Sequence, residues 1–241
     1  MDIQNKFTKG LSDGLPIGLG YLAISFAFGI MTNVYGMPVY EGCLISLFNL
    51  TSAGQLAGLP IIATGGSLIE LALTQLLINL RYSLMSVTLG QRFDKSITVL
   101  DRLYLAFALT DEVFAVSVGN KERLGKKYLL GLMILPYVGW FLGTLLGAIA
   151  GNILPELLVK ALSVAMYAMF IAIIVPAAKT SGAVCATVGI SALLSLAFAY
   201  VPKLSEIPSG FVIIICALAA SLIIAAIAPL KDDVEEVEQD A

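Results

Sequence analysis

The chain has 241 residues, of which 59% are hydrophobic and only 13% are charged, and its formal net charge is −3. A mean hydropathy of +0.93 lies far outside the range of soluble globular domains, so the chain is not an ordinary soluble domain. Basic clusters interleaved with aromatic residues do not occur in the sequence, which leaves no case for binding nucleic acid.

The hydrophobic segments predict an all-α, polytopic membrane protein with seven or eight segments, each about 20 residues long. The first segment is too long for the core of a signal peptide, so we expect it to be retained as a span. We expect one transmembrane helical domain over residues 1–230 and a solvated acidic tail over residues 231–241. The segments in chain order are 15–34, 42–63, 67–89, 103–118, 128–150, 158–178, 183–201 and 210–230.

The second segment is interrupted by small and polar residues between Asn49 and Gln55. Such residues at membrane depth indicate protein contact or a water-filled cavity, and interrupted helices often form the binding sites of carriers. Ser52, Gly54 and Gln55 are therefore candidate substrate-binding positions. The alternative is that the small residues serve only close helix packing.

The third segment carries the only basic residue that lies deep in a predicted span, Arg81, with Asn79 just before it. A cation in hydrocarbon costs several kcal/mol unless a partner compensates it. Arginine binds a carboxylate through two parallel hydrogen bonds and stays protonated, which suits recognition of an anionic or zwitterionic solute. The alternative is an internal ion pair with Asp111, Glu112 or Glu70 that only locks helices together.

The fourth segment is short and contains Asp111 and Glu112. It is consistent with a broken helix, a re-entrant segment or a span with a polar middle. On a helix the two carboxylates point about 100° apart, so one can pair with Arg81 while the other titrates. Because the chain has no histidine, any proton relay must use carboxylates. The alternative is that Asp111 and Glu112 face water at the end of a loop and have no role in transport.

Two weak patterns bear on topology. Leu15-Pro16 and Leu135-Pro136, each followed by several glycines, could open two inverted repeats with interrupted helices, formed by segments one to three and five to seven. The positive-inside rule favours an external N-terminus and a fourth segment that does not cross, with nine basic residues inside and four outside. Eight crossings with an internal N-terminus give eight against five. Both arrangements place the C-terminus in the cytoplasm.

Four stretches resemble the hallmarks of the AzlC family, the large subunit of bacterial branched-chain amino acid exporters. They begin at Gly14 (GLPIGLG), Ala53 (AGQLAG), Ile78 (INLRYSLM) and Leu109 (LTDEVFA). The resemblance implies a multi-pass protein of the bacterial cell membrane that exports branched-chain amino acids, driven by the proton gradient, together with a small AzlD-type membrane subunit. It also implies functional roles for Gln55, Asn79, Arg81, Asp111 and Glu112. Members of the family usually have an aromatic residue directly after this glutamine, whereas this chain has Leu56. The resemblance therefore leaves open which substrate side chains are preferred.

Competing functions are weighed by their motifs. An intramembrane protease motif and a Walker-type loop are both missing, so we expect neither an enzyme nor direct use of ATP. Three isolated cysteines without histidine predict no metal site, and no cofactor is expected. The alternative to a carrier is a channel-like or scaffold subunit of a membrane complex for another small solute.

Overall fold

The structure is a computed structural model that describes residues 3–155, 157–159, 161, 171, 174–176, 178–179 and 181–227. Its contacts divide the chain into two compact units, residues 1–169 and 170–241, and each is described by itself. The described residues are mostly helical, which confirms the all-α class. Most of the predicted segment 158–178 and the whole acidic tail lie outside the described residues, so the number of segments stays a prediction.

Four described helices are long and apolar enough to cross a membrane, judged by length and composition. Two of them, α1 (Phe7–Val34) and α8 (Lys126–Gly151), belong to the first unit. The other two, α10 (Gly182–Tyr200) and α11 (Ser209–Ile227), belong to the second unit and pack against each other. The protein is therefore a helical membrane protein.

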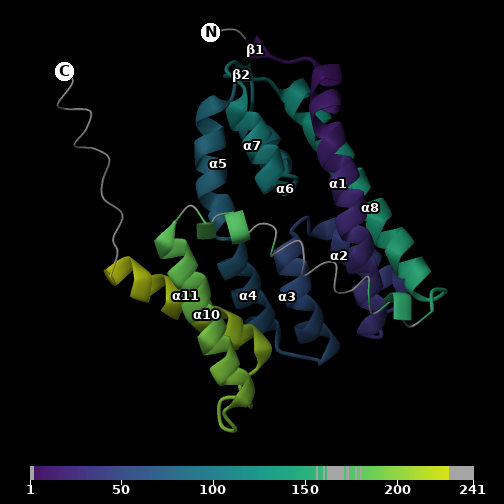
Figure 1. Ribbon diagram of the computed structural model, residues 1–241. Coiled ribbons are helices and arrows are strands. Elements are labelled where there is room, and N and C mark those ends of the chain that lie inside the picture. The colour runs from purple at the N-terminus through teal and green to yellow at the C-terminus, as the bar shows by residue number, and fades with distance from the viewer. Residues whose placement is uncertain are drawn as a thin grey trace. The chain divides into compact units, whose positions relative to one another are not determined.

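Helices α1 and α8 run parallel and in close contact (Figure 1). Residues Gly18, Phe26 and Asn33 of α1 meet Gly139, Gly147 and Gly151 of α8 in the same order. A Cβ atom built at Gly147 would lie 2.0 Å from the backbone oxygen of Phe26. Only glycine permits this approach, in the manner of small-residue helix interfaces in membranes.

The beginnings of these two helices are tied together by a short parallel pair of strands, β1 (Ile3–Gln4) and β2 (Arg123–Leu124). We call this end of the first unit the strand end, and the other the far end. The described part of the first unit also contains three pairs of shorter helices, and a short break separates the two helices of each pair.

The first pair, α2 (Val39–Phe48) and α3 (Ser52–Ala63), forms a hairpin that enters from the far end. Gly42 of α2 packs against Thr32, near the C-terminus of α1. After an extended break at Asn49–Thr51, α3 returns antiparallel to α4, with Gly54 beside Gln75 and Gly58 beside Leu71. The predicted crossing by residues 42–63 is thus wrong, because the break lets the chain turn back.

The second pair, α4 (Leu68–Asn79) and α5 (Arg81–Arg92), runs from the far end to the strand end, with its interruption at Leu80. Together the two helices run along the first unit from one end to the other. Just beyond α5, Phe93 forms a parallel bridge with Leu124 beside strand β2, which fixes the direction of the pair.

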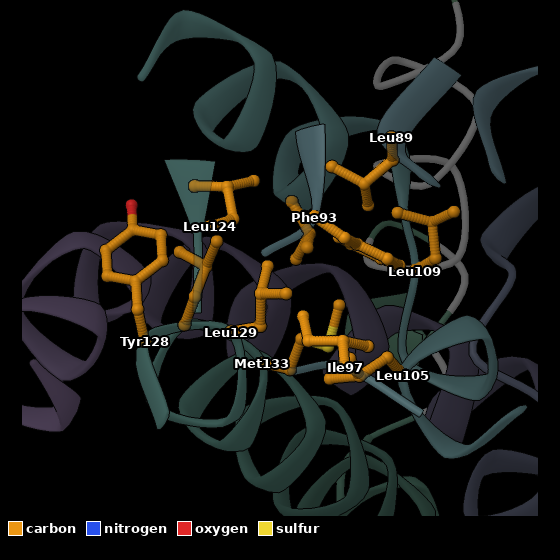
Figure 2. Close-up of a cluster of buried hydrophobic side chains, with 11 residues drawn as sticks. Leu89, Phe93, Ile97, Leu105, Leu109, Leu124, Tyr128, Leu129 and Met133 are labelled. Atoms are coloured by element: carbon orange, nitrogen blue, oxygen red, sulfur yellow. The ribbon is translucent and has the colours of Figure 1, made fainter. Parts of the chain in front are cut away.

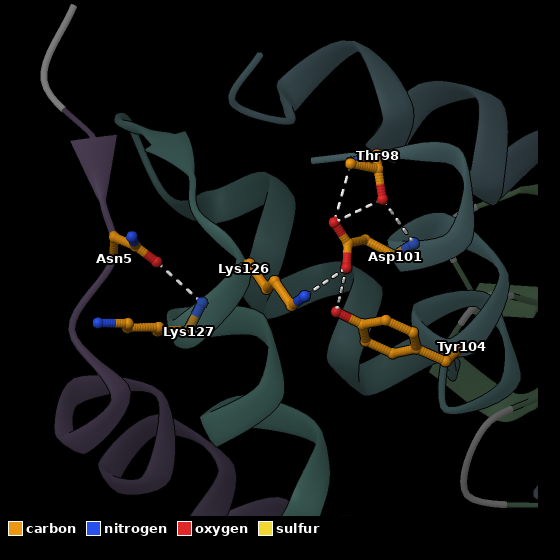
Figure 3. Close-up of polar contacts among 6 residues, drawn as sticks. All are labelled: Asn5, Thr98, Asp101, Tyr104, Lys126 and Lys127. Atoms are coloured by element: carbon orange, nitrogen blue, oxygen red, sulfur yellow. Dashed lines mark hydrogen bonds and ion pairs between the residues drawn. The ribbon is translucent and has the colours of Figure 1, made fainter. Parts of the chain in front are cut away.

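The third pair, α6 (Val99–Phe107) and α7 (Asp111–Gly119), forms a hairpin that enters from the strand end. Its outer end is pinned by Asp101, which pairs with Lys126 and accepts hydrogen bonds from Thr98 and Tyr104 (Figure 3). The Lys126 ammonium, above all, lowers the pKa of the Asp101 carboxyl. Of the three arrangements predicted for residues 103–118, this hairpin fits the re-entrant one.

A hydrophobic cluster fills the strand-end half of the first unit (Figure 2). It joins α5, α6, α7 and α8 through side chains that are at most 8% exposed, and burial of this apolar surface holds the α6–α7 hairpin in place. Its buried members are Leu89, Phe93, Ile97, Leu105, Leu109, Val113, Leu124, Tyr128, Leu129, Leu132 and Met133.

These directions correct two expectations about topology. Inverted repeats opening at Leu15 and Leu135 require α1 and α8 to run in opposite directions, but they run parallel. The narrowly favoured charge arrangement placed Lys6 and Lys9 on the opposite side from Lys121–Lys127, whereas the eight-crossing arrangement placed them on the same side. In the structure they lie at the same end. Both errors have one cause, since the 42–63 hairpin does not cross and the count of crossings changes by one.

Candidate functional site

The interruptions of the short helices meet at the middle of α1 and α8. Tyr21 of α1 and Trp140 of α8 contact each other edge to face, with ring centroids 5.2 Å apart. Leu50, from the α2–α3 break, is buried against them, and Ala108, from the α6–α7 break, packs on the same cluster. Both hairpin tips therefore reach the centre of the first unit.

Matching threonines begin the second helix of each hairpin. The Thr51 hydroxyl accepts a hydrogen bond from the backbone N–H of Gly54, and the Thr110 hydroxyl accepts one from Val113, each at 3.3 Å. Both threonines are buried and follow a buried leucine, Leu50 and Leu109. These caps bring the N-termini of α3 and α7, with their partial positive charge, to the central region.

Arg81 and Asp111 form an ion pair in this region, with 2.7 Å between Nη2 and Oδ2. We expected this pair to be buried, but its two side chains are 51% and 43% exposed. Arg81 is the first residue of α5 and Asp111 the first of α7, so the helix breaks bring them together. The Arg81 guanidinium also lies over the Tyr82 ring, 5.1 Å from its centroid.

Glu112 takes a different partner from its neighbour. Its carboxylate accepts a short hydrogen bond from the hydroxyl of Tyr21, which is itself only 6% exposed, while Glu112 remains exposed. The adjacent carboxylates thus point to different groups, as their helical spacing predicts. Glu70 takes no part, because it lies at the opposite end of α4.

Asn79 belongs to a chain of amides and hydroxyls that links α3 to α4. Its Oδ1 accepts from the Thr51 hydroxyl at 2.9 Å, and its Nδ2 donates to Gln75 Oε1 at 3.3 Å. Gln75 in turn donates to the Gly54 carbonyl at 2.7 Å. A Cβ at Gly54 would lie 2.4 Å from Gln75 Oε1, so this glycine serves close packing of α3 on α4.

Gln55 is 2% exposed and is fully used within the protein. Its Nε2 donates to the Asn49 carbonyl at 2.6 Å, at the open end of α2, and its Oε1 accepts from Trp140 Nε1 at 3.1 Å. In this arrangement Gln55 holds the α2–α3 break against α8 and presents no free polar atom to a ligand. Ser52, also proposed from the sequence, is half-buried in the first turn of α3.

The candidate site is therefore centred on Arg81, Asp111 and Glu112, with Asn79 adjoining it through Thr51. Tyr21, Tyr82 and Trp140 also take part in it, although reasoning from the sequence assigned a functional role to none of them. The repeated Leu-Thr before Ser52 and Asp111 was the one sequence signal for the two caps. Among the described residues, no group of three or more potential ligands could hold a metal ion.

One positive and two negative side chains meet here, beside two helix N-termini. The guanidinium and the N-termini can receive a carboxylate, and the two acids can receive an ammonium group or a proton. Both members of the central ion pair are half-exposed, so a small zwitterion can reach them without unfolding the surrounding helices.

Comparison with known proteins identifies relatives over the same region. Residues 16–154 match the family described as AzlC protein. The chain is 33% identical over 138 residues to an uncharacterized membrane protein of Archaeoglobus fulgidus, covering 57% of this chain and 59% of the relative. It is 33% identical over 146 residues to the inner membrane protein YgaZ of Escherichia coli, covering 57% and 58%. Less than two thirds of these relatives' length is thus matched, and no solved structure matches.

Proposed function

Because the chain belongs to the AzlC family of membrane proteins, we propose that it is a secondary carrier that exports branched-chain amino acids. In this proposal it forms the large subunit of a permease in the bacterial cell membrane, with a small AzlD-type membrane protein as its partner. It carries out no chemical conversion and holds no cofactor.

The Arg81–Asp111 ion pair, placed where the interrupted helices meet, is the observation that carries this proposal. Interrupted helices near the membrane midplane commonly form the substrate sites of secondary carriers. An amino acid has one carboxylate and one ammonium group, which match Arg81 and Asp111 in charge. By opening this pair and replacing each partner, the substrate would exchange one set of ionic contacts for another.

Coupling to protons is assigned to Glu112. The arginine and two carboxylates leave the site with one net negative charge when all three are ionised. Protonation of Glu112, which already accepts a hydrogen bond from Tyr21, would make the site neutral. A net charge in a low-dielectric region is costly. A carrier whose site has no net charge therefore switches more easily between the states that face the two sides of the membrane.

The positive-inside rule orients the protein with the strand end in the cytoplasm. The described basic residues of the first unit, apart from Arg81, all belong to the segments that meet at the strand end. They are Lys6, Lys9, Arg92, Lys95, Arg102, Lys121, Arg123, Lys126 and Lys127. The N-terminus is then cytoplasmic, and export proceeds from the strand end to the far end. In this proposal α1–α3 and α4–α7 form an inverted pair of structural units, and each unit is a crossing followed by a hairpin.

Counterflow in vesicles tests the function. Vesicles that contain the purified chain and its small partner are loaded with unlabelled leucine, and uptake of labelled leucine, valine or isoleucine is measured. We expect accumulation that requires internal substrate. Arg81→Gln is expected to slow it about 10- to 100-fold, the loss typical of one charged hydrogen-bonding group.

Lys121→Gln is the control, because it also removes one positive charge but lies at the exposed strand end. Equal counterflow by Arg81→Gln and the wild type would remove Arg81 from the mechanism. Downhill flux of leucine without any counterflow would instead indicate a channel.

A further inference from the structure

A groove separate from the candidate site lies between α5 and α6 at the strand end. It has a volume of about 570 Å³, and its floor is part of the buried hydrophobic cluster in Figure 2, including Leu89, Phe93 and Leu105. The groove opens at the outer surface, since the lining residues Val99 and Leu103 are 74% and 67% exposed. Its size is that of a small-molecule site.

Among the described residues that line this groove, Arg102 is the only charged one. Its guanidinium carbon lies 5.6 Å from the centroid of the Phe93 ring, which holds the side chain against the groove wall. None of the ion pairs among the described residues includes Arg102. An exposed arginine at the edge of an apolar groove is suited to an amphipathic anion.

The acidic residues nearest in sequence are already engaged. Asp94 accepts hydrogen bonds from the backbone and hydroxyl of Ser96, and Asp101 pairs with Lys126. Lys95, in the loop that joins α5 to α6, adds a second positive charge at this end. The charge available to a ligand at the groove mouth is therefore positive.

Gly90 keeps one side of the groove open. A Cβ built there would meet only Arg102 Nη1, at 3.8 Å, so no packing contact within the helix bundle accounts for this glycine. Glycine within a helix costs up to about 1 kcal/mol relative to alanine. At Gly90 the missing side chain leaves open space next to the Arg102 guanidinium.

We propose that this groove binds an anionic phospholipid of the leaflet at the strand end. The phosphate pairs with Arg102, and an acyl chain lies between α5 and α6 on the hydrophobic floor. A zwitterionic phospholipid has the same acyl chains, but its own ammonium group competes with Arg102 for the phosphate. The net charge of the lipid therefore decides the preference. This site is independent of substrate transport and does not rest on the proposed function.

Native mass spectrometry of the full chain in detergent tests the proposal. The protein is titrated with dioleoyl phosphatidylglycerol or dioleoyl phosphatidylcholine, and retained lipid is counted for each protein molecule. We expect one retained phosphatidylglycerol and a preference for it of about fivefold or more, the effect of one basic residue near a membrane surface. Arg102→Gln is expected to remove the preference, whereas Lys121→Gln, on the same cationic end, is expected to keep it.

A second pair of variants tests the groove itself. Gly90→Leu places a branched side chain in the groove and is expected to lower the retention of both lipids, whereas Gly90→Ala adds one carbon and should bind as the wild type does. Unchanged phosphatidylglycerol binding in either Arg102→Gln or Gly90→Leu would overturn the proposal. Equal binding of the two lipids, with both displaced by the purified small subunit, would assign the groove to a protein helix and overturn it as well.

Discussion

At the scale of single residues, Gln55 shows how a polar group at membrane depth can be structural. A broken helix leaves backbone carbonyls without partners, and such groups are costly away from water. The Gln55 amide donates to the Asn49 carbonyl and accepts from Trp140, so it satisfies both the end of α2 and the indole of α8. It therefore fixes the position of the α2–α3 break.

Gln55→Leu is expected to destabilise the protein by about 1–3 kcal/mol for each buried polar group left without a partner. The measurement is thermal unfolding in detergent. Trp140→Phe keeps an aromatic ring against Tyr21 but removes the N–H donor. The double variant should lose less stability than the sum of the two single losses, because both single variants remove the same contact between Gln55 and Trp140. Strict additivity would argue against the contact.

The central site could be predicted from the sequence only in part. Charges within apolar segments need a partner, so the pairing of Arg81 with an acid was predictable, and the structure identifies Asp111. The exposure of that pair and the role of Tyr21 were not predictable, since both depend on how α1 and α7 meet. Functional roles remain predictions for all seven candidate residues, which are Ser52, Gly54, Gln55, Asn79, Arg81, Asp111 and Glu112.

At the scale of elements, the glycines of α1 and α8 set how closely the helices approach. Gly147→Ala would place a methyl group 2.0 Å from the backbone oxygen of Phe26, which cannot move unless the helices separate. We expect a loss of about 1–3 kcal/mol, as for other overpacked interiors. Thermal unfolding in detergent measures it.

Gly20→Ala is the matched control, because a Cβ at Gly20 has no neighbour within 4 Å. The substitution should leave stability unchanged or raise it slightly, through the better helix propensity of alanine. If both variants were equally stable, the close contact between α1 and α8 would not contribute to folding.

The lengths of the apolar stretches indicated that the protein is helical and spans a membrane, but they could not give the direction of each stretch. Residues 42–63 have enough apolar residues for a span, and the turn at Asn49–Thr51 depends on contacts with α8 that lie far away in the sequence. The predicted interruptions at Asn49 and Asp111 were correct in place. Whether an interrupted segment continues across or turns back was not encoded in its own composition.

At the scale of the whole molecule, the structure changes the expected membrane topology. With both hairpins re-entrant, the N-terminus lies at the same end as Lys95, and the loop between α3 and α4 lies at the far end. Single cysteines report these positions once Cys43, Cys185 and Cys216 have been replaced. In intact cells an impermeant maleimide should label Thr64→Cys.

Lys6→Cys and Lys95→Cys should react only after the cells are permeabilised. Labelling of Lys6→Cys but not Lys95→Cys from outside would contradict the parallel arrangement of α1 and α8. Labelling of both, with Thr64→Cys protected, would keep the fold but reverse the proposed orientation.

The pairing of α1 with α8 also has a consequence for biogenesis. Asn33 hydrogen-bonds the Ala148 carbonyl across 115 positions of sequence. At a ribosomal rate of 5–20 residues per second, α1 waits roughly 6 to 23 s for its partner after leaving the translocon. During that interval its glycine-lined face has only lipid, insertase or nascent hairpins to cover it, so the N-terminal half of the protein matures late, when α8 arrives.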